Sequence, residues 1–78
     1  MKNILVVDDS DIDRLLMSGL LSKLSSYSVI VAEDGEQALQ KLDEWPIDLV
    51  LTDLQMPKMD GLELVKRIRS KKLEIPVI

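Results

Sequence analysis

Apolar and polar positions along the chain form blocks that predict three short strands, each followed by a helix. Three apolar runs rich in β-branched residues have the length of buried strands, at residues 4–7, 29–32 and 47–51. The third run contains only one polar residue, Asp48, and does not alternate, which is typical of a parallel strand covered by helices on both faces. Strands and helices in alternation predict an α/β fold with a parallel sheet and right-handed crossovers.

The first predicted helix begins near Ile12 and ends near residue 25, because its apolar residues recur at spacings of three and four. The residues that share this face are Leu15, Leu16, Leu20 and Leu24. Three residues with short oxygen-bearing side chains are candidates to cap the first turn, namely Asp9, Ser10 and Asp11. Gly19 lies in mid-helix, where glycine costs up to about 1 kcal/mol, so we expect it to face a tight contact or the solvent.

The second and third helices show the same apolar spacing. The second is predicted at residues 36–42, after a loop at 33–35, and Trp45 and Pro46 close it because proline cannot continue a helix. The third follows Gly61. Its residues expected to face inward are Leu62, Leu64, Val65 and Ile68. Those expected to face outward are Glu63, Lys66, Arg67 and Arg69.

Residues 75–78, Ile-Pro-Val-Ile, predict the beginning of a fourth strand. A buried strand normally has about five or six residues, so we expect the sheet to be incomplete here. A chain of 78 residues forms at most one domain and buries only about 60% of the surface that its unfolded form exposes. We therefore expect little stability to spare.

The amino-acid composition restricts the possible chemistry to oxygen ligands. The chain has no cysteine and no histidine, which excludes disulfides, thiolate metal sites, zinc sites and Ser-His catalysis. A bound metal would have to be held by oxygen, which favours magnesium, manganese or calcium. Hydrophobic content of 46% with 31% charged residues is ordinary for a globular protein.

The net charge of −4 is unevenly distributed. Residues 1–57 hold four basic and eleven acidic side chains, net −7, whereas residues 58–78 hold six and three, net +3. Proteins that bind nucleic acid normally carry a dominant basic face, so direct nucleic-acid binding is not expected. The basic residues near the end of the chain are interpreted as a solvated helix face. No signal peptide or membrane span is visible, so we expect no membrane association and a cytoplasmic location.

Three aspartates follow predicted strands: Asp8 and Asp9 follow the first, and Asp53 follows the third. If those strands are neighbours in a parallel sheet, the three carboxylates meet at one edge, where ligands of open α/β sheets bind. Three carboxylates close together repel one another unless a cation neutralises their charge. Their grouping therefore indicates a Mg²⁺ site that retains several waters. The alternative is that Asp9 caps its helix and Asp8 is a solvated loop residue.

A calcium loop is a competing interpretation of the same acidic stretch. Asp9, Asp11 and Asp13 alternate as at the start of an EF-hand loop. That loop needs glycine at its sixth position and glutamate at its twelfth, where this chain has Arg14 and Leu20. The calcium interpretation is therefore rejected, and Asp11 and Asp13 are expected to be first-turn acids favoured by the helix dipole.

Three segments of the chain form a combined pattern, namely VVDDSD at residues 6–11, LVLTDLQMPKMDGLEL at 49–64 and IPVI at 75–78. Together they resemble the receiver domain of bacterial response regulators. The resemblance runs the length of the chain and implies a flavodoxin-like, doubly wound parallel sheet of order 2-1-3-4-5. On this basis residues 1–78 would be an incomplete receiver domain, truncated at the start of the fourth strand.

The resemblance also implies a site and a reaction. Asp53 would be the phosphoacceptor, and Asp9, Asp53 and the backbone carbonyl of Gln55 would bind Mg²⁺ directly, with Asp8 assisting through water. The phosphoryl group would come from a phosphohistidine on a sensor histidine kinase or a histidine phosphotransfer domain. A carboxylate can act as the nucleophile in such a transfer, and the metal can neutralise its charge.

The chain also departs from the family pattern. The family has a serine or threonine at the end of the fourth strand, an aromatic switch residue on the fifth strand and a lysine after the fifth. None of these has a counterpart here, and neither Lys58 nor Lys66 matches the lysine. Whether the chain catalyses its own phosphorylation therefore stays open. The alternative is a non-signalling folding fragment, or an association module that forms a homodimer through its open sheet edge. An aspartyl-phosphate hydrolase is disfavoured, because Gln55 stands where that class has a second acid.

Overall fold

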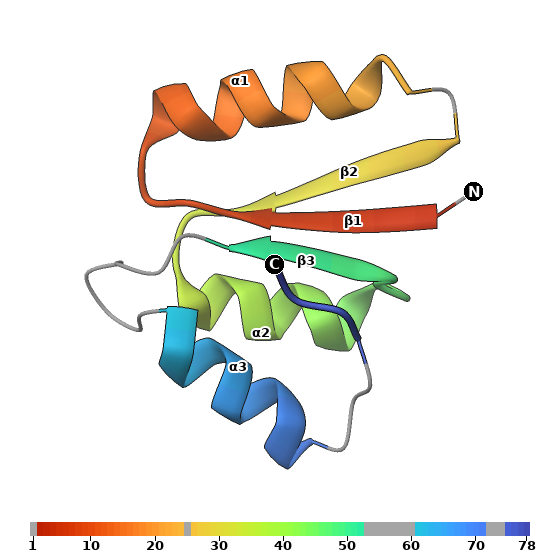
Figure 1. Cartoon of the computed structure of the whole chain (residues 1–78). Coiled ribbons are helices and arrows are strands. Elements are labelled where there is room, and N and C mark those ends of the chain that lie inside the picture. Colours follow the sequence, from red (N-terminus) through yellow and green to blue (C-terminus); the bar gives the residue numbers. More distant parts are fainter. Residues whose placement is uncertain (1, 25, 53–60, 72–74) are drawn as a thin grey trace.

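The polypeptide folds into a parallel sheet with helices on both faces, as the computed structural model shows for residues 2–24, 26–52, 61–71 and 75–78 (Figure 1). Its elements are β1 (Lys2–Val7), α1 (Asp11–Ser22), β2 (Tyr27–Ala32), α2 (Gly35–Glu44), β3 (Leu49–Thr52) and α3 (Gly61–Ser70). The strands are parallel and lie in the order β2-β1-β3. The predicted α/β alternation and parallel sheet are confirmed.

The strands β1 and β2 both begin two residues earlier than their apolar runs. Lys2 and Asn3 are paired with Tyr27 and Ser28, so polar residues extend the ladder toward its amino end. A prediction based on apolar runs misses such residues because their side chains need no burial. The helices also differ at their ends, since α1 stops at Ser22 and α2 runs from Gly35 to Glu44.

The strand β3 begins at Leu49, two residues later than predicted, because Asp48 makes a side-chain contact at the start of the ladder. The main-chain N–H of Asn3 donates to Oδ2 of Asp48 at 2.7 Å, and the N–H of Asp48 donates to the carbonyl of Asn3 at 2.8 Å. A carboxylate therefore accepts where a strand carbonyl would otherwise do so. Ile47, just before it, is buried although it lies outside the strand.

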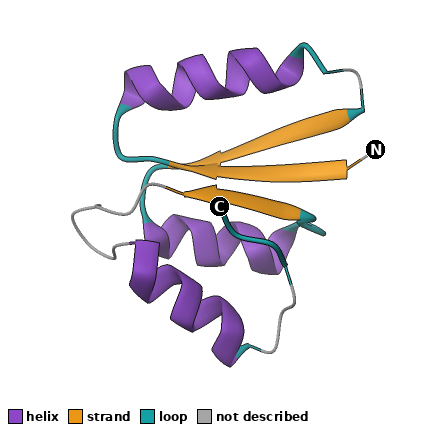
Figure 2. Ribbon diagram, in the orientation of Figure 1, coloured by secondary structure: helices purple, strands orange, loops and turns teal. Residues whose placement is uncertain are grey.

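Two layers of helix cover the sheet unequally, with α1 on one face and α2 and α3 on the other (Figures 1 and 2). The main core lies on the α2/α3 side. Its buried members are Leu5, Val7, Ala32, Ala38, Ile47, Val50, Leu64 and Ile68. Ile4 and Val6, which alternate with Leu5 and Val7 along β1, are buried on the face that α1 covers.

The predicted apolar face of α1 is largely exposed in the described structure. Leu15, Leu16 and Leu20 are 61–73% exposed, and α1 has no fully buried residue. A Cβ added to Gly19 would meet nothing within 4 Å, so the solvent-facing alternative for this glycine is confirmed. α1 therefore stabilises the fold less than the helices on the other face.

One inward residue of α3 was predicted wrongly. Leu64 and Ile68 are fully buried, whereas Leu62 is 66% exposed. Successive helical residues are rotated by about 100°, so Leu62 lies about 200° from Leu64 and faces away from the core. Of the residues predicted to face outward, Lys66, Arg67 and Arg69 are exposed and Glu63 is half-buried.

The segment 76–78 lies along β3, on the side opposite β1. The N–H of Val50 donates to the carbonyl of Pro76 at 2.9 Å, the N–H of Ile78 donates to the carbonyl of Val50 at 2.9 Å, and Thr52 donates to Ile78 at 3.0 Å. This forms a parallel bridge between Val50 and Val77, and it adds the segment to the sheet at the place predicted for a fourth strand. No helix in the described ranges has the length and apolar character needed to cross a bilayer.

Candidate functional site

The strands β1 and β3 are direct neighbours, and their carboxyl ends lie level with each other. Val7 is the register partner of Thr52, and each is the last residue of its strand. The condition on which the acidic site was predicted is therefore met for the strands themselves. Two predicted site residues, Asp53 and Gln55, lie outside the described residues.

Asp8 is a half-buried residue held by three hydrogen bonds. Its N–H donates to the carbonyl of Ala32 on β2 at 3.1 Å, and its carboxylate Oδ1 accepts from the N–H of Ser10 at 2.9 Å. Its own carbonyl accepts from Arg14. The interpretation of Asp8 as a solvated loop residue is therefore wrong.

Asp9 is exposed, and it does not cap α1. The N-cap is Ser10, whose Oγ accepts from the N–H of Asp13 at 3.3 Å. Of the three cap candidates the structure selects the hydroxyl, so the carboxylate of Asp9 is not used in this helix start. Asp11 and Asp13 lie in the first turn of α1, where the helix dipole favours acids, as predicted.

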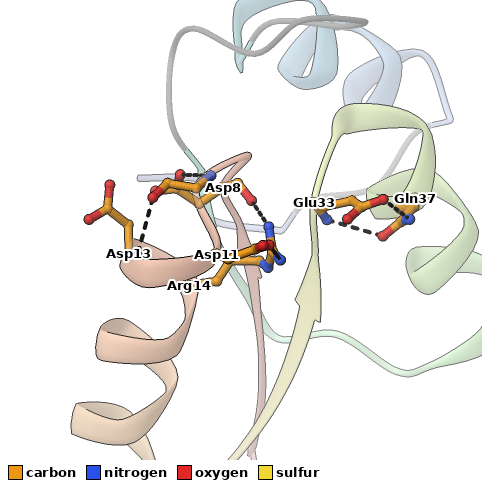
Figure 3. A network of polar contacts seen from close by, with 7 residues as sticks. Asp8, Asp11, Asp13, Arg14, Glu33 and Gln37 are labelled. Carbon is orange, nitrogen blue, oxygen red and sulfur yellow. Dashed lines mark hydrogen bonds and ion pairs between the residues drawn. The ribbon is translucent and has the colours of Figure 1, made fainter.

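Arg14 joins α1 to the turn that carries the acidic pair (Figure 3). Its Nη1 donates to the carbonyl of Asp8 at 2.7 Å, and its Nη2 pairs with Oδ1 of Asp11. The Arg14 side chain is only 16% exposed. Sequence reasoning used Arg14 only to reject a calcium loop, although its spacing of three from Asp11 was a signal for an ion pair.

A second polar cluster lies at the start of α2, after β2 (Figure 3). Gln37 Oε1 accepts from the N–H of Glu33 at 3.1 Å, and Gln37 Nε2 donates to the Glu33 carboxylate at 2.9 Å. The N-cap of α2 is Asp34, which accepts from the N–H of Gln37 at 2.8 Å. These acids are engaged in local structure, and in the described parts of the chain no three acidic side chains are grouped as a metal site would require.

A groove of about 490 Å³ lies beside Asp8. Its lining is mainly apolar, with Val6, Met17 and Leu51 next to the polar side chains of Asp8, Asp13 and Thr52. The donors that the described turn offers are carboxylate oxygens, which are the ligands that Mg²⁺ prefers, and the sequence contains no histidine or cysteine. The residues present therefore fit a hard cation.

Comparison with known proteins gives consistent likenesses. A family model described as "Response regulator receiver domain" matches residues 4–78. The alkaline phosphatase synthesis transcriptional regulatory protein PhoP of Bacillus subtilis is 43% identical over 77 residues, which cover 99% of this chain and 32% of that protein. The sensor histidine kinase RcsC of Escherichia coli is 48% identical over 75 residues, covering 96% of this chain and 8% of RcsC. The chain thus spans about a third or less of these relatives.

Two solved structures share the fold. The response regulator protein TrrA of Thermotoga maritima, solved in complex with Mg²⁺-BeF, is 42% identical with a TM-score of 0.90, over 99% of this chain and 66% of that one. The chemotaxis protein CheY4 of Vibrio cholerae is 35% identical with a TM-score of 0.92, and the match covers 99% of this chain and 65% of the CheY4 chain. These likenesses confirm the flavodoxin-like fold, and the observed order β2-β1-β3 matches its first three places.

Proposed function

Because the chain belongs to the response regulator receiver domain family, we propose that it is a phosphoacceptor module of two-component signalling. Residues 1–78 would form the amino-terminal part of that domain, and Asp53 would accept the phosphoryl group. The donor would be a phosphohistidine on a sensor histidine kinase or a histidine phosphotransfer domain, and the encounter would take place in the cytoplasm.

The observation that carries this proposal is the level ending of β1 and β3. Val7 lies opposite Thr52, so the chain leaves both strands at one edge of the sheet. Asp8 and Asp9 follow β1 in the sequence, and Asp53 is the residue that follows β3. A phosphoacceptor with acidic neighbours needs this arrangement, because phosphoryl transfer depends on positioning and on neutralisation of charge.

The proposed metal is Mg²⁺, held directly by Asp9, Asp53 and the backbone carbonyl of Gln55, with Asp8 assisting through water. When bound, the ion would neutralise the charge that collects where an anionic nucleophile approaches a phosphoryl group. The complex of TrrA with Mg²⁺-BeF supports this choice by similarity. The half-buried Asp8, fixed by Ser10 and Ala32, would hold its position before the ion arrives.

The proposed reaction transfers a phosphoryl group between two side chains. A carboxylate oxygen of Asp53 forms a bond to phosphorus while the P–N bond of the phosphohistidine breaks. The electron pair of that bond stays on the imidazole nitrogen of the donor. The product on this chain is an acyl phosphate.

The test is labelling by acetyl phosphate, followed by intact-mass spectrometry. The wild-type chain should gain one phosphoryl group in the presence of Mg²⁺, and the label should be lost with excess chelator and in Asp53→Asn. The matched control is Glu44→Gln, which removes an exposed carboxylate of the same charge from the last residue of α2, outside the groove beside Asp8. Labelling of Asp53→Asn at the wild-type level would contradict the site assignment.

A second candidate function is association of two copies of the chain. It is favoured by the exposed apolar side chains of α1 and by the position of β2 at one edge of the described sheet. Size-exclusion chromatography with light scattering tests it. A dimer that persists on dilution would support association, whereas a monodisperse monomer would count against it.

A further inference from the structure

We infer that Arg14 is a positioning residue for the acidic pair, holding the main-chain carbonyl of Asp8 and so setting where Asp8 and Asp9 present their carboxylates. This inference rests on the proposed function, because it assigns Arg14 a role at the proposed Mg²⁺ site. Arg14 would act through the backbone and would not touch the metal or the phosphoryl group.

The first support is that the hydrogen bond from Arg14 to the carbonyl of Asp8 is partly buried and has a charged donor. Nη1 of Arg14 lies 2.7 Å from the carbonyl oxygen of Asp8, and this contact is partly buried. The other guanidinium nitrogen, Nη2, pairs with the carboxylate of Asp11, whose side chain is 89% exposed. Exposed ion pairs contribute little, whereas hydrogen bonds from an ionised donor are short and strong. The contact with Asp8 therefore matters more than the ion pair beside it.

The second support is the geometry of the backbone around Asp8. The N–H of Asp8 is bound to Ala32, which fixes the peptide plane before this residue. The carbonyl of Asp8 is bound to Arg14, which fixes the plane after it. Because a peptide unit is planar, that second plane contains the nitrogen and Cα of Asp9. One guanidinium thus orients both acids: the side chain of Asp8 and the position from which Asp9 projects.

The third support is the target that Arg14 selects. It binds a carbonyl oxygen of Asp8 and the carboxylate of Asp11, and the Asp8 carboxylate is engaged instead by the N–H of Ser10 (Figure 3). Arg14 therefore brings a positive charge to an acidic turn without pairing with the Asp8 carboxylate. Such an arrangement orders the turn and leaves oxygen atoms available for a cation, as outer-shell partners of metal sites do.

The experiment compares Arg14→Gln and Arg14→Lys with the wild type. Amide hydrogen exchange at Ser10 is measured by NMR without metal, and Mg²⁺ affinity is measured by titration of amide shifts. The matched control is Arg67→Gln, which removes an arginine from a helical ion pair with Glu63, on α3. Folded fractions from urea denaturation normalise every affinity.

We expect Arg14→Gln to speed exchange at Ser10 and to weaken Mg²⁺ binding about 10-fold, the lower end for outer-shell substitutions. Arg14→Lys should recover part of both, because an ammonium group can replace one bond but not the two-pronged geometry. Arg67→Gln should leave both unchanged. Partial rescue by lysine separates positioning from a general loss of stability.

The inference is overturned if Arg14→Gln leaves Ser10 exchange and Mg²⁺ affinity at wild-type values. It is equally overturned if the loss of affinity follows the folded fraction, or if Arg67→Gln lowers affinity as much. If the wild-type chain binds no Mg²⁺, the proposed function fails, and metal-free exchange at Ser10 still decides whether Arg14 orders the turn.

Discussion

Val7 and Thr52 are register partners at the last positions of β1 and β3. This relationship brings the acidic turn after β1 to the same edge as the chain that leaves β3. Side chains of a strand alternate between faces, so a slip of one residue would move every side chain of β3 to the other face. The buried side chain of Val50 therefore keeps the edge in register as well as filling the core.

Replacing either acid of the turn should weaken Mg²⁺ binding. We expect Asp9→Asn, at a proposed direct ligand, to have the larger effect, and Asp8→Asn to reduce affinity about 10- to 100-fold, as changes in outer-shell groups do. Isothermal titration with MgCl₂ measures both. Glu44→Gln is the control, with an expected change below about twofold, because Glu44 is exposed at the end of α2 and does not line the groove beside Asp8. Equal affinity in all three variants would contradict the assignment.

Two leucines on α3 should differ sharply in their effect on stability. Leu64 is fully buried and Leu62 is 66% exposed. Leu64→Ala should lower the free energy of unfolding by about 2–5 kcal/mol, since it leaves a cavity, and Leu62→Ala by less than about 0.5 kcal/mol. Urea denaturation followed by circular dichroism checks both values. A large loss at Leu62 would mean that this face of α3 is covered in solution.

The N-caps of α1 and α2 should contribute unequally. Asp34 is buried, and its Oδ1 accepts from the N–H of Gln37 at 2.8 Å. Ser10 lies in a more exposed turn, and its Oγ accepts from the N–H of Asp13 at 3.3 Å. We expect Asp34→Ala to cost about 1–2 kcal/mol and Ser10→Ala about 0.5–1 kcal/mol. Asp34→Asn, which can still cap, is the control and should lose less than Asp34→Ala. The same denaturation experiment decides the order, and a reversed order would refute it.

Asp48 should stabilise the start of β3 through its side chain. Its carboxylate accepts from the N–H of Asn3 at 2.7 Å, so Asp48→Ala leaves that donor to water and should cost about 1 kcal/mol. Asp48→Asn retains an acceptor and should cost less. Hydrogen exchange at Asn3 provides a local check, since its amide should exchange faster in the alanine variant. Unchanged exchange in that variant would show that the contact is not formed in solution.

Much of the fold could be predicted because burial leaves a periodic record in the sequence. The apolar runs located three strands, and the spacing of Leu64 and Ile68 identified the buried line of α3. The strand ends were less visible, since Lys2 and Asn3 join the ladder through their backbone alone. Leu62 was misplaced because an apolar residue can stay exposed wherever helical rotation carries it away from the core.

The candidate site, like the fold, could be predicted from the sequence only in part. The acids Asp8 and Asp9 could be named from the sequence, because polar residues after a buried strand lie at the sheet edge. The choice of Ser10 as the cap, and the bond from Arg14 to the carbonyl of Asp8, could not be named. Both depend on the directions in which backbone and side-chain groups point, which residue types alone do not specify.

By itself the sequence determined the α/β order, the restriction to oxygen ligands and the acids available for a cation. Those properties follow from composition and local periodicity, which each segment carries within itself. Only the tertiary structure decided that β1 lies between β2 and β3, that Asn3 meets Asp48 across 45 positions of chain, and that the apolar face of α1 is exposed. These features depend on residues that are distant in sequence. They are established only when the strands pair in one order and one register.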